Sequence, residues 1–262
     1  MTLARINGHP RDGDITFQEE GHIYTITGID KHPVSVTTLI HQNFPHFDAD
    51  LIITKMMRGK NWPTSKYFGM NQEEIKKLWE DNGKEASGLG TTMHKSIEDF
   101  IESQVSGVPF ESNGMKTKEF SFFLQFWKDF KESNPNFQPY RTEWLVYDIE
   151  KLISGSIDMT FANEKGEIAI LDWKRSKEIK KSNPFGKGLG VLSHMDDCNF
   201  SHYSLQLNIY RYLLEKNYGK KVVAMYLLIF HPDNDNGSYK FFEVPFLYKE
   251  IDDLIGSRES IV

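Results

Sequence analysis

The sequence of 262 residues contains one cysteine, Cys198, and no long apolar run. One cysteine cannot form an intrachain disulfide, a four-thiolate iron–sulfur cluster or a cysteine-rich zinc site. The longest strongly apolar run, residues 222–230, is well short of the roughly 20 residues that a membrane-spanning helix needs. The first ten residues do not resemble a secretory signal. The sequence therefore predicts a soluble protein with no membrane contact, in a reducing intracellular compartment that it does not specify further.

Basic residues are outnumbered by acidic ones, 31 to 37, which gives a formal net charge of −6. This balance excludes a uniformly basic nucleic-acid binder, because phosphates are neutralised by Lys and Arg gathered along the bound backbone. Any contact with nucleic acid must therefore be local. One basic stretch would suit it: Lys174, Arg175, Lys177, Lys180, Lys181 and Lys187.

The first part of the chain is predicted to be a hairpin followed by helices. Residues 15–18 and 22–26 are rich in β-branched and aromatic side chains, which is typical of a hairpin. Helices are expected over 36–40 and 49–58, and another begins after Asn71, where Glu74 completes a capping box. We expect residues 1–88 to form an N-terminal hairpin and helical cap region and residues 89–262 a catalytic core, together making one compact unit.

The second part predicts a mixed sheet covered by helices, an α/β fold. Apolar residues recur at helical spacing after Gly90 and again over 120–130, before Asn134-Pro135 ends the second helix. The strands expected next form a meander, and a long loop over 180–202 precedes another helix. The expected strands are 142–147, 155–161 and 168–173, then 222–230 and 239–244 after the helix over 203–217.

The segment most indicative of chemistry is an apolar strand that ends in Asp172-Trp173-Lys174. Alternation along a strand places Asp172 and Lys174 on the same face. A carboxylate there can hold a hard cation, and the ammonium beside it can position an attacking water or stabilise charge on a phosphoryl oxygen. An Asp-x-Lys seen alone is more often a surface ion pair, so other features must support the interpretation.

Three other motifs add polar side chains. Asp158 lies among alternating apolar residues, where an unpaired carboxylate is costly unless it binds a metal or accepts structural hydrogen bonds. His94 and Glu98 are four residues apart on one helix and can face one site, or can form a weak solvated pair. Gln206 and Tyr210 have the same spacing, opposite an apolar stripe, where they can bond a phosphate or steer Lys174; an ordinary exposed pair is the alternative.

In this order the motifs resemble the RecB-like branch of the PD-(D/E)XK nuclease superfamily, with its restriction-endonuclease-like core. The resemblance covers about residues 85–215 and is carried by Gly-x-x-x-His-x-x-x-Glu from Gly90, Glu143, Gly155-Ser156-Ile157-Asp158, Leu171-Asp172-Trp173-Lys174 and Gln206-x-x-x-Tyr210. The Pro-Asp of the superfamily name is replaced by Ile157-Asp158. Within the branch, the chain is similar to the mitochondrial genome maintenance exonuclease group and its viral relatives, and lacks the cysteines of the iron–sulfur relatives.

The resemblance implies a role for each matching position. His94, Asp158 and Asp172 would hold one or two Mg²⁺ or Mn²⁺ ions, helped by the Trp173 carbonyl. Lys174 would be the catalytic lysine, and Glu98 and Glu143 would support the site. Contacts with the substrate would come from Gln206 and Tyr210, together with Arg175 and Lys177 of the basic stretch.

The implied function is metal-dependent hydrolysis of DNA phosphodiester bonds, as an exonuclease on single-stranded ends in DNA repair or replication. Three alternatives stay open at this point: a structure-specific or double-strand-acting endonuclease or alkaline exonuclease of the same superfamily, a non-catalytic DNA-binding subunit, and a phosphoesterase for small molecules. The sequence does not define protein partners, cleavage polarity, oligomeric state, or preference for DNA over RNA.

Overall fold

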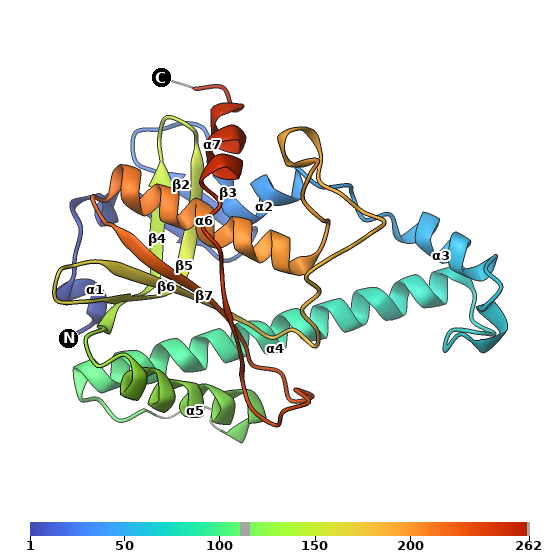
Figure 1. Ribbon diagram of the computed structural model, residues 1–262, viewed down its shortest axis with the longest axis horizontal. Coiled ribbons are helices and arrows are strands. Elements are labelled where there is room, and N and C mark those ends of the chain that lie inside the picture. The colour runs from blue at the N-terminus through green and yellow to red at the C-terminus, as the bar shows by residue number, and fades with distance from the viewer. Residues whose placement is uncertain (111–115, 261–262) are drawn as a thin grey trace. The chain divides into compact units, whose positions relative to one another are not determined.

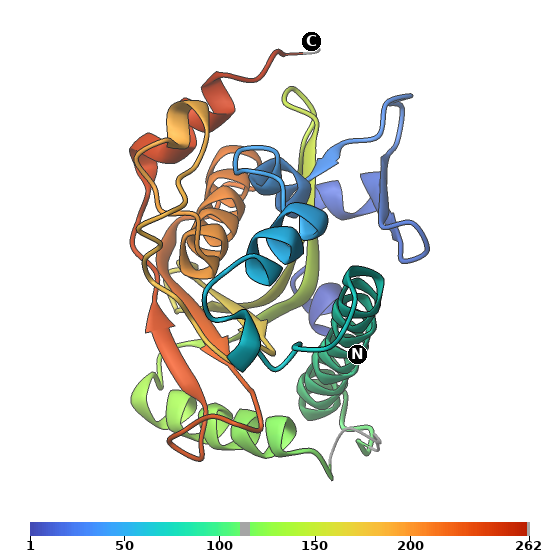
Figure 2. The same cartoon turned by 90° about the vertical axis from the view of Figure 1, so that its right-hand side faces the viewer.

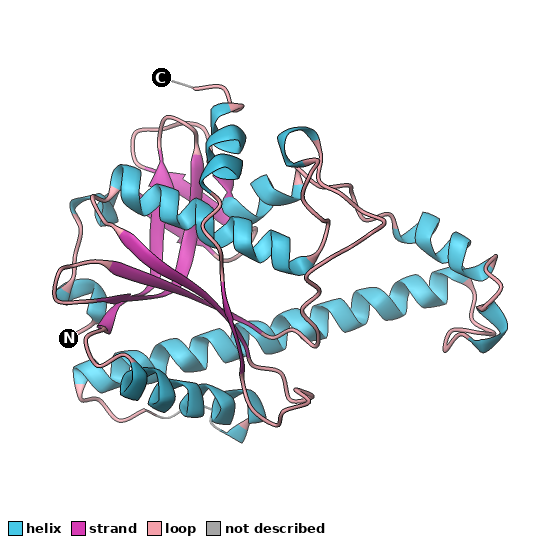
Figure 3. Cartoon of the chain, viewed as in Figure 1, coloured by secondary structure: helices cyan, strands magenta, loops and turns pink. Residues whose placement is uncertain are grey.

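The computed structural model describes residues 1–110 and 116–260, in a mixed α/β fold (Figures 1 and 3). Its helices are α1 (Leu3–Ile6), α2 (Val36–His41), α3 (Ala49–Met57), α4 (Gln72–Ser106), α5 (Lys118–Ser133), α6 (Asn199–Asn217) and α7 (Tyr248–Gly256). Its strands are β1 (Ile15–Gln18), β2 (Ile23–Ile26), β3 (Val34–Ser35), β4 (Gln138–Asp148), β5 (Ile153–Ala162), β6 (Ile168–Lys174), β7 (Val222–Ile229) and β8 (Lys240–Glu243).

The central sheet combines parallel and antiparallel pairs, as the sequence predicts. Its order is β3-β5-β6-β7-β8, and β4 pairs with β5. The β4–β5–β6 segment is the expected antiparallel meander. Strand β6 pairs in parallel with β7, so β6 lies between two neighbours and is buried along most of its length.

Helices cover both faces of the sheet, and each face has its own apolar core. Helices α2, α6 and α7 pack on one face through residues such as Leu39, Leu213 and Ile251. Helix α5 and the last turns of α4 pack on the other through an aromatic-rich cluster that includes Phe123 and Trp173. Helices α6 and α5 accordingly lie on opposite sides of the strands in Figures 1 and 2.

Helix α4 is longer than the sequence predicts, since it runs without interruption from Gln72 to Ser106. The capping box at its start is confirmed: Asn71 N–H donates to Glu74 Oε2 at 2.7 Å and Glu74 N–H to Asn71 Oδ1 at 3.0 Å. We expected a separate helix to begin after Gly90. A glycine in a helix costs only about 1 kcal/mol relative to alanine, which the flanking turns offset.

The chain divides into a smaller unit, residues 46–92, and a larger unit of residues 1–45 and 93–262. This differs from the expected grouping of residues 1–88, because the β1–β2 hairpin belongs to the larger unit. Its Ile15, Tyr24 and Ile26 are buried in the core of that unit. Within the residues that the structure describes, no helix is both long and apolar enough to cross a membrane.

Candidate active site

Asp172 and Lys174 lie at the end of β6, on the face that the alternation predicted. Lys174 Nζ is 2.5 Å from Asp172 Oδ2, and Asp172 is only 1% exposed. Burial raises the pKa of Asp172 to about 6; the Lys174 ammonium opposes this rise and Asp158 adds to it. The pair is therefore a buried ion pair and not the surface pair that an isolated Asp-x-Lys would suggest.

Asp158 is positioned on β5 by the backbone of the next strand. Its Oδ2 accepts a hydrogen bond of 2.8 Å from the N–H of Trp173. Burial raises the pKa of Asp158, while Lys174 and the Trp173 N–H favour the charged form. The carboxylate thus lies beside the Asp172–Lys174 pair, where the sequence placed it.

His94 reaches the same place from α4. Its Nε2 is 3.0 Å from the Trp173 carbonyl oxygen, and its Nδ1 is 3.7 Å from Asp158 Oδ2. Burial, with a further contribution from Lys174, lowers the pKa of His94 to about 4, so the imidazole is neutral at pH 7. With Nε2–H donating to the carbonyl, the lone pair of Nδ1 faces the carboxylates and is free to bind a cation.

Glu143 enters the site from β4, with a backbone φ of 42°, in the left-handed region that non-glycine residues rarely adopt. Its neighbours keep regular pairing with β5, so the unusual conformation is confined to this residue. Its Oε1 is 4.0 Å from His94 Nδ1, and its Oε2 accepts a bond of 2.8 Å from Ser156. Burial and, secondly, Asp158 raise the pKa of Glu143 to about 8.

These groups form a donor set that fits a hard divalent cation. Ligand atoms of His94, Glu143 and Asp158 all lie within 4.8 Å of one another. Carboxylate oxygens suit Mg²⁺ and Mn²⁺, a neutral imidazole is a capable metal ligand, and a bound cation would offset the burial that raises the carboxylate pKa values. The sequence predicted His94, Asp158 and Asp172 as the ligands. Glu143 lies close to the first two, and Asp172 is paired with Lys174, so the ligand set stays a prediction.

Gln206 and Tyr210 lie beneath Asp172. Gln206 Nε2 donates to Asp172 Oδ1 at 3.2 Å and to the Tyr210 hydroxyl at 3.3 Å. Both side chains are buried, so they are not the exposed pair left open by the sequence. The Tyr210 ring packs on Gly155, where a Cβ would be 2.7 Å from Cε1 of the ring. Their predicted contact with substrate stays a prediction; the observed contact is with Asp172.

The remaining predicted residues have partners of their own. Glu98 accepts a hydrogen bond of 2.9 Å from Lys95 on the same helix. Arg175 donates its Nε–H to Glu119 Oε1 at 2.7 Å. Lys177, with 77% of its side chain exposed, lies 3.6 Å from Asp233. Their roles in catalysis and substrate binding stay predictions.

Sequence reasoning missed two partners. Ser156 belongs to the Gly155-Ser156-Ile157-Asp158 motif, and its hydroxyl donates a hydrogen bond to Glu143. The sequence did not predict this contact because it depends on the pairing of β4 with β5. Glu119, the partner of Arg175, is a buried acid at the start of the aromatic helix α5. Its position among apolar residues could have indicated that it needs a basic partner.

The model of the PD-(D/E)XK nuclease superfamily matches residues 65–254, and the chain belongs to this superfamily. This confirms the superfamily that the motifs predicted. No curated protein matches the chain.

Among solved structures, the chain is similar to SSO0001, with 14% identity over 85% of this chain and 71% of that one and a TM-score of 0.32. It is also similar to a protein from Eubacterium rectale named "Putative exonuclease", with 13% identity over 81% of this chain and 66% of that one and a TM-score of 0.36. At these values the two structures add nothing to the assignment.

Proposed function

We propose that this nuclease is a divalent-metal-dependent deoxyribonuclease that removes nucleotides from the ends of single-stranded DNA. The observation that carries the hydrolytic part is the Lys174 ammonium, 2.5 Å from the buried Asp172 and beside the His94, Glu143 and Asp158 cluster. Membership of a nuclease superfamily supports it.

We assign the metal, Mg²⁺ or Mn²⁺, to His94, Asp158, Asp172 and the Trp173 carbonyl, with Glu143 as a further ligand. A bound ion of this kind would lower the pKa of a water and stabilise negative charge on the phosphoryl group. His94 is suited to the role because it is neutral at pH 7 and the contact of its Nε2 with the Trp173 carbonyl leaves Nδ1, 3.7 Å from Asp158 Oδ2, to bind the ion.

Lys174 orients the attacking water and stabilises the charge that grows on the phosphate oxygens. Gln206 and Tyr210 hold Asp172 in place from below, through the hydrogen bonds at 3.2 and 3.3 Å. Lys177, three residues after the end of β6 and largely exposed, contacts a backbone phosphate of the bound strand. Arg175 is the second such contact, with the N–H groups that Glu119 leaves available.

The preference for single-stranded ends is supported by the resemblance of the motifs to an exonuclease group. Fold alone does not define a substrate, so the preference needs a direct test. That test is a panel of linear single-stranded, linear duplex and circular single-stranded DNA of the same sequence, incubated with Mn²⁺ or Mg²⁺ and sampled over time.

Stepwise shortening of the linear single strand, with the circle untouched, supports the proposal. Cuts in the circle contradict it in favour of an endonuclease, and degradation of the duplex at an equal rate contradicts the strand preference. Binding without cleavage contradicts the enzymatic assignment itself.

A further inference from the structure

The smaller unit carries a basic segment within an acidic protein. We define this segment as residues 51–71, which contain four cations and no Asp or Glu. Lys55, Arg58, Lys60 and Lys66 are all exposed. In the part of the chain that the structure describes, none of the four pairs with a carboxylate, whereas Lys76 of the same unit pairs with Asp50 at 3.0 Å. The four charges are therefore available to an anionic partner.

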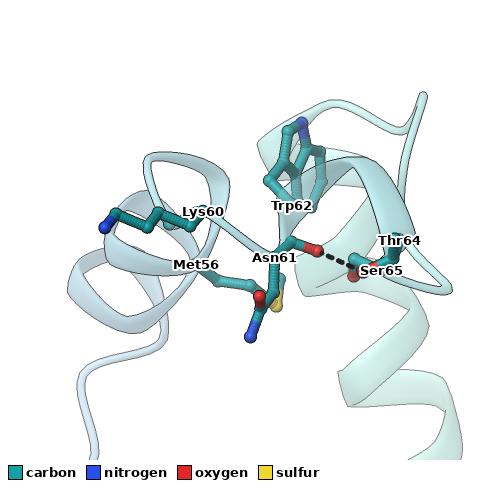
Figure 4. A pocket seen from close by; sticks show the side chains of 7 residues that line it. Met56, Lys60, Asn61, Trp62, Thr64 and Ser65 are labelled. Atoms are coloured by element: carbon teal, nitrogen blue, oxygen red, sulfur yellow. Dashed lines mark hydrogen bonds between the residues drawn. The ribbon is translucent and has the colours of Figure 1, made fainter.

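A pocket of about 400 Å³ opens in the basic segment, within the range of small-ligand sites (Figure 4). It lies between the end of α3 and the short 3₁₀ helix Trp62–Thr64. Met56 and Trp62 supply apolar surface and Asn61, Thr64 and Ser65 supply polar groups, while the Lys60 side chain extends away from Trp62 (Figure 4). This combination matches a nucleobase, which has an apolar face and a polar edge.

The pocket is held by local hydrogen bonds and does not depend on a ligand to form. Trp62 N–H donates to the Gly59 carbonyl at 3.0 Å, and Ser65 N–H to the Trp62 carbonyl at 2.9 Å. The Trp62 ring also meets the edge of Phe68 at 5.9 Å between centroids, although Phe68 is itself 59% exposed. Two accessible aromatic rings beside unpaired cations are typical of surfaces that bind single-stranded nucleic acid.

We infer that this pocket binds one base of single-stranded DNA, with Trp62 stacking on the base and Lys60 and Arg58 contacting the adjacent phosphates. The inference rests on the proposed function, which makes DNA the substrate. A duplex is excluded as the ligand because its bases are covered by their neighbours and cannot enter a pocket. The site holds the strand and takes no part in the cleavage chemistry.

The test measures binding of a fluorescently labelled single-stranded oligonucleotide by anisotropy, with the full chain carrying Lys174→Ala to prevent cleavage. Adding Trp62→Ala should raise Kd about tenfold, as expected for loss of one base–aromatic stack, and Trp62→Phe should restore most of the affinity. Lys60→Glu should also weaken binding and lower the slope of log affinity against log salt by about one.

Matched controls come from the same unit, outside the basic segment. Phe47 is 63% exposed and Lys77 has 76% of its side chain exposed, so Phe47→Ala and Lys77→Glu should leave Kd within about twofold. All variants should unfold at the temperature of their parent, which separates lost contacts from lost folding.

Two results would overturn the inference: an unchanged Kd for Trp62→Ala and Lys60→Glu, or an equal loss of affinity for blunt duplex DNA. With Lys174 intact, Trp62→Ala should raise KM for single strands and preserve kcat. A wild-type protein that cleaves no DNA but shows the expected binding pattern would remove the proposed nuclease function and leave the pocket. Cleavage by the wild-type protein together with an unchanged Kd for Trp62→Ala would remove the pocket and leave the nuclease function.

Discussion

The Lys174 Nζ atom lies 2.5 Å from Asp172 Oδ2, and the two side chains leave the same face of β6. Burial alone would lower the pKa of Lys174, but the attraction of Asp172 and Asp158 raises it above its ordinary value. Lys174 therefore remains an ammonium at neutral pH. It can donate hydrogen bonds and stabilise negative charge, but it cannot act as a general base.

Replacement of this ammonium should abolish most of the activity. We expect Lys174→Ala to lower kcat about 100-fold or more, because the charge that forms on the phosphate would lose its stabilising donor. The measurement is single-turnover cleavage of a labelled single strand in Mn²⁺.

A second lysine offers a matched control for that experiment. Lys216 Nζ is 2.9 Å from Oδ2 of Asp148, which is 1% exposed, at a place that the proposed chemistry does not use. Lys216→Ala should lower the unfolding temperature and preserve kcat. Equal losses of activity in the two variants would show that activity is lost with any buried ion pair. The Lys174 ammonium would then have no catalytic role of its own.

The carboxylates make the stability of the metal-free protein depend on pH. Burial raises the pKa of Asp172 to about 6 and that of Glu143 to about 8, above their ordinary values of 3.8 and 4.5. The folded state therefore binds more protons than the unfolded state in this range. The stabilisation is complete below about pH 4 and is lost as the pH rises towards 8.

In EDTA, the unfolding temperature should accordingly fall most steeply between about pH 6.5 and 8, because at lower pH the lowered pKa of His94 opposes the effect of the carboxylates. Glu143→Gln should reduce the fall, though only in part, because 36% of the Glu143 side chain is accessible and solvent screens it. Mn²⁺ should raise the unfolding temperature more at pH 8 than at pH 6. Glu132→Gln on the exposed side of α5 is the control. If the unfolding temperature falls with pH equally steeply in both variants, Glu143 does not cause the fall.

Gly155 is predicted to be essential for the packing of Tyr210. A Cβ at this position would be 2.7 Å from Tyr210 Cε1 and 3.2 Å from Val36 Cγ2, between a strand and two helices that cannot easily move. Gly155→Ala should cost about 1–3 kcal/mol of the free energy of unfolding and lower kcat, since Tyr210 supports Gln206 under Asp172.

Gly83 in α4 has nothing within 4 Å of its would-be Cβ, so Gly83→Ala should be neutral or stabilise by up to about 1 kcal/mol. Denaturant unfolding of both variants checks the contrast. A Gly155→Ala protein as stable as the parent would show that the tyrosine can move aside.

The sequence predicted the meander and α5 because the periodicities of strands and helices are local signals. The resemblance placed Glu143 in support of the site but did not predict that its carboxylate lies close to possible ligand atoms of His94 and Asp158. That closeness depends on the pairing of β4 with β5 and on a left-handed backbone that Arg141-Thr142-Glu143-Trp144 does not reveal. The spacing of Gln206 and Tyr210 showed that they share one side of a helix. That side is buried because α6 is covered on nearly all sides, so an argument from amphipathicity could not identify Asp172 as their partner.

Arg175 and Lys177 should respond differently to truncation although both are predicted to contact DNA. Arg175→Ala would leave Glu119, which is 8% exposed, without its guanidinium, so stability should fall by about 1–3 kcal/mol while KM rises. Lys177→Ala should raise KM and leave stability unchanged, because its side chain is 77% exposed. If Lys177→Ala changes KM and Arg175→Ala does not, Arg175 does not contact DNA and serves only to pair with Glu119.

The most direct test of the account is a titration of Mn²⁺ into EDTA-treated protein, with cleavage of an end-labelled single strand followed at each step. We predict no cleavage before the metal is added, a saturable rise in rate with it, and no rise in Asp158→Asn. Cleavage that persists in EDTA, or an Asp158→Asn protein that is activated like the wild type, would contradict a metal site at His94, Asp158 and their neighbours.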